Sequence, residues 1–333
     1  MKIMETPEIK ESLVTQYDKP IIYYAPPLIF NHVHIQPHPF FFSIFYFFFS
    51  FFFPFFFFFF FIKIMLKAVP LSFTKFGNQT KAPLIICHGL FGSKQNWKSL
   101  AKNINEQTQS PVYTVDARNH GNSPHVEPHT YGLMAQDILK LIKDEGLENP
   151  MLMGHSMGGK VMMDVALNQP ELPSKLIVID MPPIPIKLST EYNTHAEAMK
   201  EINALQLKKQ KEADEVLQKY EPDLIVRQFL LTNLKKNLKK DGIYEFRVAY
   251  DTLGRSIGHM GDFFQSEPNK VYHGPTLFIT GDVSPYRKYF IQHADMIKAQ
   301  FPNSRLENIK GAGHWVQTEQ PKAFLSSVIN FIN

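Results

Sequence analysis

Short apolar runs alternate with longer amphipathic segments after residue 65, and this alternation restricts the possible folds more than any other feature of the chain. Apolar runs of this length suit buried strands, and the intervening segments are long enough for helices. Such an order predicts a mostly parallel, doubly wound sheet with helices on both faces. The clearest strands are predicted at residues 83–87, 112–115, 150–154, 175–180 and 276–281.

A Gly, Asp or His ends or follows each of these runs. In open α/β sheets, functional groups lie in loops at the carboxyl ends of the strands. We therefore expect the reactive residues of this chain at that edge of the sheet.

The alternation stops between residues 181 and 246, where the sequence becomes polar and rich in Lys, Glu, Gln, Asn and Leu. We interpret residues of about 182–246 as a helical lid inserted into a domain that spans residues 65–333. The domain is expected to open with a strand pair after Met65. The sheet pattern resumes at residue 276, followed by a helix near 289–301, a strand near 305–309 and a closing helix from Pro321.

The segment Gly154-His155-Ser156-Met157-Gly158 matches the pattern G-x-S-x-G. A predicted strand precedes it and a helical run follows it, which is the context of the nucleophile elbow of the α/β-hydrolase fold. On such a turn the serine hydroxyl projects into a cleft, and glycines on both sides leave room for the neighbouring backbone. The sequence predicts this fold, with Ser156 as the nucleophile.

A serine hydroxyl needs a base, and His314 is the best placed histidine. It lies after the last predicted strand and before the final helix, which fits the chain order serine, acid, histidine. His120 and His155 are predicted to be mainly structural. The backbone N–H groups of Leu90 and Met157 are the candidates for an oxyanion hole.

Three aspartates between Ser156 and His314 could orient the histidine. Asp180 ends a predicted strand. Asp282 follows the strand at 276–281, but the usual spacing would place the acid at Ser284. Asp251 lies in the segment 246–251, which is expected to be helical. There an ion pair with Arg247, four positions earlier, would explain the aspartate without a catalytic role. The position favours Asp180, and the alternatives remain open.

Composition limits the chemistry further. The net charge of +4 gives no reason to expect a nucleic-acid partner. The single cysteine, Cys87, excludes an internal disulfide framework, and no Cys/His cluster has the spacing of a metal site. We therefore expect side-chain chemistry without a metal or other cofactor.

The leader, residues 1–64, contains 17 phenylalanines between Phe40 and Phe61. The 23 uncharged residues 40–62 are long enough to span a bilayer as a helix. Nearly pure phenylalanine is also what a T-rich stretch of DNA encodes, so the segment is either a membrane anchor or a mistranslated region. The leader has no arginine and does not read as a mitochondrial presequence.

From about Pro70 onward the chain resembles the α/β hydrolase domain-containing protein 11 family. The resemblance rests on HGLFGSKQNW from His88, VDARNHGNSPH from Val115, GHSMGGK from Gly154, VRQFLLTNL from Val226, GPTLFITG from Gly274 and AGHW from Ala312. It implies an esterase or lipase, described in animal members as an sn-1-specific diacylglycerol lipase.

The resemblance carries further implications for the site and the partners. Ser156 and His314 match the family's nucleophile and base. Asp251 matches the acid named in animal members, and Asp180 the acid named in bacterial and yeast relatives. Yeast relatives transfer acyl groups to alcohols. Animal members are mitochondrial and are connected with lipoylated 2-oxoacid dehydrogenase complexes, so a role as a binding protein for such a complex is a third alternative.

Leucines at positions 230, 231, 234 and 238 recur at helical spacing beside lysines 235, 236, 239 and 240. The spacing predicts a basic amphipathic helix in the lid. Such a helix either packs its leucines on the cleft or rests on an anionic lipid surface.

Overall fold

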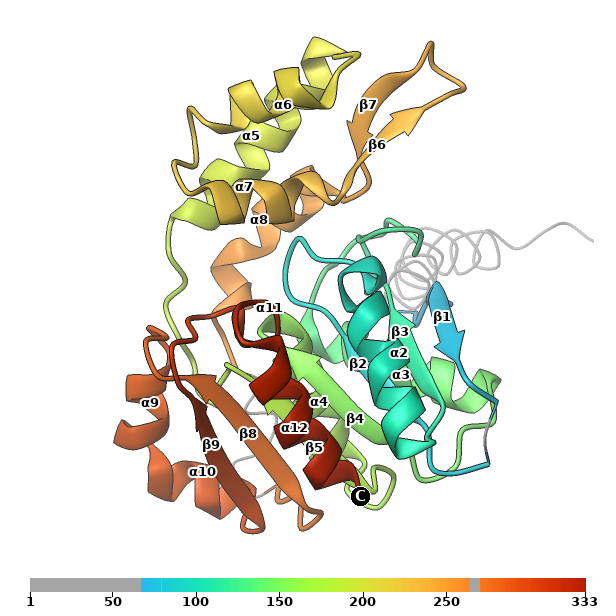
Figure 1. Cartoon of the computed structure of the whole chain (residues 1–333), viewed down its shortest axis with the longest axis vertical. Helices are drawn as coiled ribbons and strands as arrows, with labels where there is room; N and C mark the ends of the chain where they lie inside the picture. The colour runs from blue at the N-terminus through green and yellow to red at the C-terminus, as the bar shows by residue number, and fades with distance from the viewer. Residues whose placement is uncertain (1–66, 79, 264–269) are drawn as a thin grey trace, which may run out of the picture. The chain divides into compact units, whose positions relative to one another are not determined.

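The computed structural model describes residues 67–78, 80–263 and 270–333, and the leader with its phenylalanine tract lies outside them. A seven-stranded sheet forms the centre of the hydrolase body (Figure 1). The strands are parallel except the edge strand β1, which pairs antiparallel with β3. In spatial order they are β1 (Phe73–Phe76), β3 (Val112–Val115), β2 (Leu84–Cys87), β4 (Met151–His155), β5 (Lys175–Ile179), β8 (Thr276–Gly281) and β9 (Ser304–Ile309).

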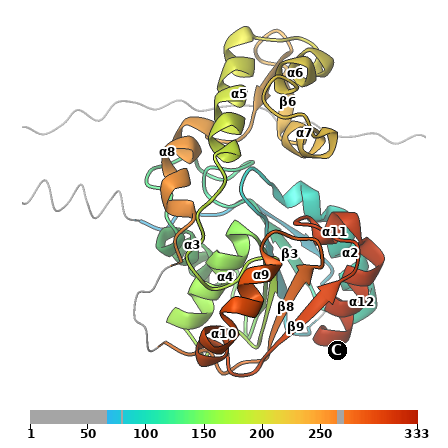
Figure 2. The same ribbon diagram turned by 90° about the vertical axis from the view of Figure 1, so that its left-hand side faces the viewer.

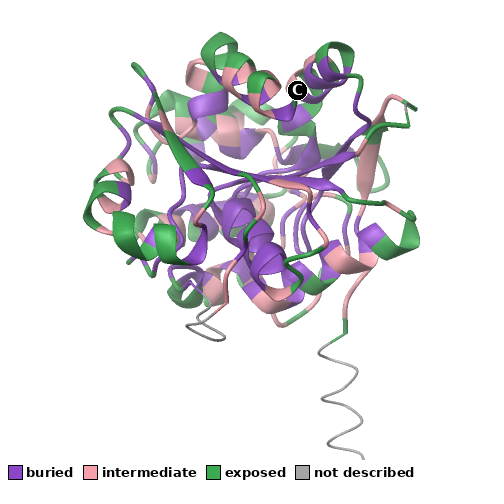
Figure 3. Cartoon of the chain, turned by 90° about the horizontal axis from the view of Figure 1, so that it is seen from below, coloured by how far each residue is buried: buried purple, intermediate pink, exposed green. Residues whose placement is uncertain are grey.

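The central strands bury both faces, because alternate side chains enter different cores. On β5, Leu176 and Val178 join one apolar cluster, whereas Ile177 and Ile179 join the other. Figure 3 shows the resulting arrangement, a buried sheet between two layers of helices. The continuous apolar runs of the sequence reflect this double burial.

Helices α2 and α12 contact each other and contribute to one cluster, while α3 and α4 pack together and contribute to the other. The helices of the body, with a 3₁₀ turn before α2, are η1 (Lys94–Trp97), α2 (Lys98–Thr108), α3 (Tyr131–Asp144), α4 (Met157–Asn168), α9 (Arg287–Gln292), α10 (Ala294–Gln300), α11 (Val316–Glu319) and α12 (Pro321–Ile332). Proline at the start of α12 suits a position whose backbone N–H has no helical partner.

The insertion between β5 and β8 forms a lid above the body (Figures 1 and 2). Its elements are α5 (Glu191–Leu205), α6 (Gln210–Leu217), α7 (Leu224–Leu231), β6 (Leu234–Asn237), β7 (Ile243–Phe246) and α8 (Tyr250–Met260). Asp223 caps α7, since its carboxylate accepts a hydrogen bond from Ile225 N at 2.7 Å.

The fold class predicted from the sequence is confirmed, but several local predictions are wrong. The expected amphipathic helix over residues 230–238 is instead the end of α7 followed by the β6–β7 hairpin. The expected helix over 289–301 is two short helices, α9 and α10. The opening strand pair is one strand, β1, which pairs with β3 rather than with a neighbour in sequence.

Within residues 67–78, 80–263 and 270–333, no helix is both long and apolar enough to cross a bilayer.

Candidate active site

Ser156 lies between β4 and α4 in a strained conformation, with φ of 53° and ψ of −118°. This region is unfavourable for residues with a Cβ and is typical of functional turns. Two glycines make the turn possible. A Cβ on Gly154 would overlap the Gly158 backbone, and a Cβ on Gly158 would overlap the Cys87 carbonyl at the end of β2. Both positions therefore require glycine.

His314 follows β9 and lies beside Asp180, which follows β5. The Nδ1 atom of His314 is 2.7 Å from Asp180 Oδ2. Since a carboxylate only accepts, Nδ1 donates, and Nε2 is the ring nitrogen left for the serine. Ser156 and His314 line the same cavity.

Asp180 is completely buried and its carboxylate is extensively hydrogen-bonded. The hydroxyl of Thr280 donates to Oδ1 at 2.5 Å, and the hydroxyl of Ser284 donates to Oδ2 at 2.6 Å. These donors and His314 compensate the cost of removing the carboxylate from water. The network fixes the position of the carboxylate behind the imidazole.

The other two candidate acids lie elsewhere. Asp251 is on the first turn of α8, with its side chain 54% exposed, and its nearest cation is Lys200 at 3.7 Å rather than Arg247. Asp282 accepts a hydrogen bond from Gly311 N at 2.7 Å. Only Asp180, of the three, contacts His314. The helix expected over residues 246–251 starts only at Tyr250.

Two backbone donors face the region of the serine. Met157 N–H begins α4, where the helix dipole contributes partial positive charge. Leu90 N–H lies in the turn after β2, next to Phe91, whose own N–H donates to His120 Nε2 at 3.2 Å. Among the described residues, neither Leu90 N–H nor Met157 N–H has an acceptor. Both are free to bind a substrate oxygen.

His155 supports the loop that carries His314. Its Nε2–H donates to the His314 carbonyl oxygen at 2.9 Å, and the two ring centroids are 4.8 Å apart. Burial lowers the pKa of His155 to about 3, so the ring is neutral near pH 7. This agrees with the structural role predicted for it.

Buried groups also hold the loops after β2 and β3. His120 donates through Nδ1 to the Arg118 carbonyl at 2.9 Å. Lys94 pairs with Asp116 at 2.7 Å, with both side chains buried. These contacts position the turn that contains Leu90.

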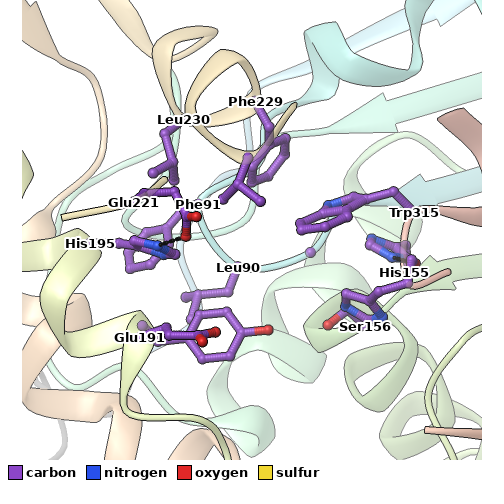
Figure 4. Close-up of a pocket in the computed structure, with 14 residues that line it drawn as sticks. Leu90, Phe91, His155, Ser156, Glu191, His195, Glu221, Phe229, Leu230 and Trp315 are labelled. Atoms are coloured by element: carbon purple, nitrogen blue, oxygen red, sulfur yellow. Dashed lines mark hydrogen bonds and ion pairs between the residues drawn. The ribbon is translucent and has the colours of Figure 1, made fainter. Parts of the chain in front are cut away.

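The cavity in front of Ser156 lies between the body and the lid (Figure 4). It encloses about 570 Å³, open solvent at its mouth included. Apolar and aromatic side chains make up about half of its lining, and charged or polar side chains make up the rest. They include Leu90, Phe91, His155, Ser156, Glu191, Tyr192, His195, Glu221, Val226, Phe229, Leu230, His314 and Trp315.

No group of His, Cys, Asp and Glu side chains in the described part of the chain is arranged to hold a metal ion.

Sequence reasoning did not assign a role to Ser284, Thr280, His195 or Glu221. One signal was present for Ser284, which stands at the usual spacing for the acid after a strand of this kind. The lid residues carried no such signal, because only the folded lid brings them to the cavity.

The site combines a strained serine on an elbow with a histidine held by a buried aspartate and two free backbone donors. These features define a serine ester hydrolase of the α/β-hydrolase fold. Residues 82–321 match the model of the alpha/beta hydrolase fold family. Within that fold, the chain belongs to the α/β hydrolase domain-containing protein 11 family.

Curated relatives cover most of the described chain. The abhydrolase domain-containing protein C22H12.03 of Schizosaccharomyces pombe is 38% identical, over 80% of this chain and 99% of that protein. The mouse sn-1-specific diacylglycerol lipase ABHD11 is 37% identical, over 80% of this chain and 86% of that protein. A Saccharomyces cerevisiae protein named "Probable alcohol acetyltransferase" is 34% identical, over 78% of this chain and 80% of that protein.

A solved structure, a marine microorganism esterase, is also similar. It superposes with a TM-score of 0.72 at 35% identity, and the match covers 79% of this chain and all of that one.

Proposed function

We propose that the protein hydrolyses lipid esters, diacylglycerols among them, through an acyl-serine intermediate. The observation that carries the proposal is the 2.7 Å contact between His314 and the buried Asp180 in the cavity that contains the strained Ser156. The name of the mouse relative supports diacylglycerol as the substrate class.

In the proposed mechanism, His314 Nε2 takes the proton of the Ser156 hydroxyl as its oxygen attacks the ester carbonyl. Asp180 stabilises the imidazolium that forms. The N–H groups of Leu90 and Met157 bind the developing oxyanion. His314 returns the proton to the departing alcohol, and then activates the water that releases the acid.

The lining of the cavity supports a lipid ester. Leu90, Phe91 and Leu230 are buried there, with Val226 and Phe229 beside them. Burial of an acyl chain against such a wall contributes about 0.8 kcal/mol for each methylene.

The central test is Ser156→Ala. The variant should lose labelling by a fluorophosphonate probe and at least about a thousandfold in kcat on a diacylglycerol. His259→Ala, in an exposed position on α8, is the matched control and should react normally. Labelling of the Ser156→Ala protein would refute the catalytic assignment.

An alcohol acyltransferase would use the same residues, and the yeast relative supports this second candidate. The two reactions differ in whether water or an alcohol attacks the acyl-enzyme. Product analysis with added ethanol separates them: free fatty acid as the dominant product supports hydrolysis, and ethyl ester as the dominant product supports transfer.

The lid hairpin supports a contact with a membrane surface. Leu238 is 83% exposed at the turn between β6 and β7, and Lys235, Lys236, Lys239 and Lys240 are exposed around it. An apolar tip surrounded by cations suits an anionic lipid surface.

The mitochondrial location, the anchoring by residues 40–62 and the contact with a 2-oxoacid dehydrogenase complex remain predictions from the leader and the family resemblance. If binding to such a complex were the function, Ser156→Ala would preserve it. N-terminal sequencing of the native protein would decide whether residues 1–64 are present, because it reads the first residue directly.

A further inference from the structure

A buried polar pair lies in the lid wall of the cavity, which also includes Glu191, Tyr192 and the apolar Val226, Phe229 and Leu230. His195 on α5 and Glu221 after α6 are 6% and 8% exposed, and His195 Nε2 is 2.8 Å from Glu221 Oε2. Both residues line the cavity that contains Ser156. Figure 4 shows the pair on the opposite side of this cavity from Ser156, so it is separate from the reacting groups.

The hydrogen bonds of this pair leave one atom free. Glu221 accepts from His195 through Oε2, and from the backbone N–H of Asp223 through Oε1 at 2.8 Å. His195 Nδ1 has no hydrogen-bond partner among the described residues. It is also not fully buried, because it is absent from the buried atoms that lack a partner. The nitrogen is therefore partly accessible, and the residue that carries it lines the cavity.

The rings of Phe91 and Tyr192 hold the imidazole in place. Their centroids lie 6.5 Å and 6.3 Å from that of His195, both in edge-to-face arrangements. The orientation of Nδ1 is thus fixed before substrate enters. A fixed polar atom in an apolar pocket selects ligands that can satisfy it, since an unpaired buried group costs free energy.

The free nitrogen restricts the chemistry of its partner. Because Nε2 donates to Glu221, Nδ1 is an acceptor when the ring is neutral and a donor when it is protonated. A hydroxyl can pair with Nδ1 in either state, whereas a carbonyl pairs only with the protonated ring and an alkyl group with neither.

We propose that His195, oriented by Glu221, binds a hydroxyl group of the ester substrate and makes the enzyme selective for hydroxyl-bearing esters. The proposal rests on the proposed ester hydrolysis at Ser156. The hydroxyl belongs either to the alcohol part of the ester, as in a partial glyceride, or to the acyl chain. In both cases the site adds one hydrogen bond that a plain ester does not form.

Two matched substrate pairs test the proposal with the full-length protein. The first compares a glycerol monoester with the propyl ester of the same acid, and the second compares 4-nitrophenyl esters of acids with and without a terminal hydroxyl. We expect kcat/KM for the hydroxyl-bearing member of one pair to be about tenfold higher, as one hydrogen bond predicts. The pair that shows the preference identifies the source of the hydroxyl.

The His195→Phe variant should reduce this ratio to about one. Because His195→Phe leaves the Glu221 carboxylate buried without its partner, the double variant His195→Phe with Glu221→Gln is measured as well. His259→Phe, at an exposed position of α8, is the control and should keep the ratio of the wild type.

Two results would overturn the proposal: equal kcat/KM within both substrate pairs for the wild type, or an unchanged preference in the double variant. Neither result affects the proposed hydrolysis, which is judged separately by the loss of all activity in Ser156→Ala. Thermal unfolding of each variant establishes that it is folded.

Discussion

Two residues of the catalytic triad, Ser156 and Asp180, have positive φ values of 53° and 50°. Each directly follows the last residue of a central strand, β4 for Ser156 and β5 for Asp180. The surrounding structure maintains this strain, which costs of order 1 to 3 kcal/mol at each residue. The turn at Asp180 brings its carboxylate into contact with His314, and the turn at Ser156 places the serine in the cavity that His314 also lines.

The two alternative acids can be separated by a pair of single substitutions. Asp180→Asn should lower kcat by at least about a thousandfold, since an amide neither stabilises the imidazolium nor selects its tautomer. Asp251→Asn should stay within about twofold, because its side chain is half exposed beside Lys200. Steady-state kinetics on a soluble ester is the measurement. A large loss in Asp251→Asn alone would refute the assignment.

Ser284 occupies the place where many hydrolases carry the acid, and here it donates a hydrogen bond to Asp180 Oδ2 at 2.6 Å. Ser284→Ala should lower kcat about tenfold, because a hydrogen bond to a charged group contributes about 1.5 to 3 kcal/mol. KM should change little, which separates positioning of the acid from substrate binding. Ser284→Thr should restore most of the rate; failure of this rescue would count against the role of the hydroxyl.

At the scale of elements, the lid differs most from its sequence-based prediction. The leucines at 230, 231 and 234 are buried, as in the predicted apolar face, but Leu238 is exposed in a hairpin. Asp241 and Gly242, the last two residues of the loop 238–242, both have positive φ, which Asp and Gly adopt more readily than most residues. This pair was a turn signal in the sequence, and the spacing of the leucines outweighed it in the predicted helix.

The hairpin tip is expected to bind anionic membranes. Leu238→Ser combined with Lys239→Gln should weaken binding to phosphatidylcholine vesicles that contain phosphatidylserine by about tenfold, since each lysine contributes about 1 kcal/mol near such a surface. Co-sedimentation with the vesicles measures the binding. Ile291→Ser combined with Lys288→Gln on α9, another exposed apolar and cationic pair, is the control. Equal binding of both double variants would contradict the prediction.

At the scale of the whole molecule, buried neutral histidines link stability to pH. Burial lowers the pKa of His129 and of His155 to about 3, and it also lowers the pKa of His88 and His120. Below pH 6.5 the unfolded chain takes up protons at these sites, whereas folded His129 and His155 stay neutral until about pH 3. Stability must therefore fall as the pH falls through this window.

Each strongly shifted histidine should cost up to about 1.4 kcal/mol of unfolding free energy per pH unit below 6.5. His129→Leu should reduce the slope by about this amount between pH 6 and pH 5. Its Nε2 has no hydrogen-bond partner among the described residues, and the variant loses one hydrogen bond, from Asn119 Nδ2 to Nδ1 at 3.3 Å. Denaturant unfolding at several pH values measures the slope. A free energy independent of pH would contradict the assignment of neutral histidines.

The amino-acid sequence by itself determined the parallel sheet and the places of Ser156 and His314. The apolar runs indicate strands that are buried on both faces. The G-x-S-x-G pattern indicates the elbow, because only glycine fits on either side of the serine. Both signals depend only on residues that are close together in the sequence, so they can be recognised before the fold is known.

Only the tertiary structure decided which aspartate contacts His314, and which lid residues reach the cavity. Asp180 and His314 are separated by 134 positions and meet because β5 and β9 flank β8 in the sheet. The same holds for Ser284 and for the pair of His195 and Glu221, whose contacts depend on how distant elements pack. Long-range packing of this kind leaves no periodic pattern in the chain. For that reason the sequence favoured Asp180 but could not exclude Asp251 and Asp282.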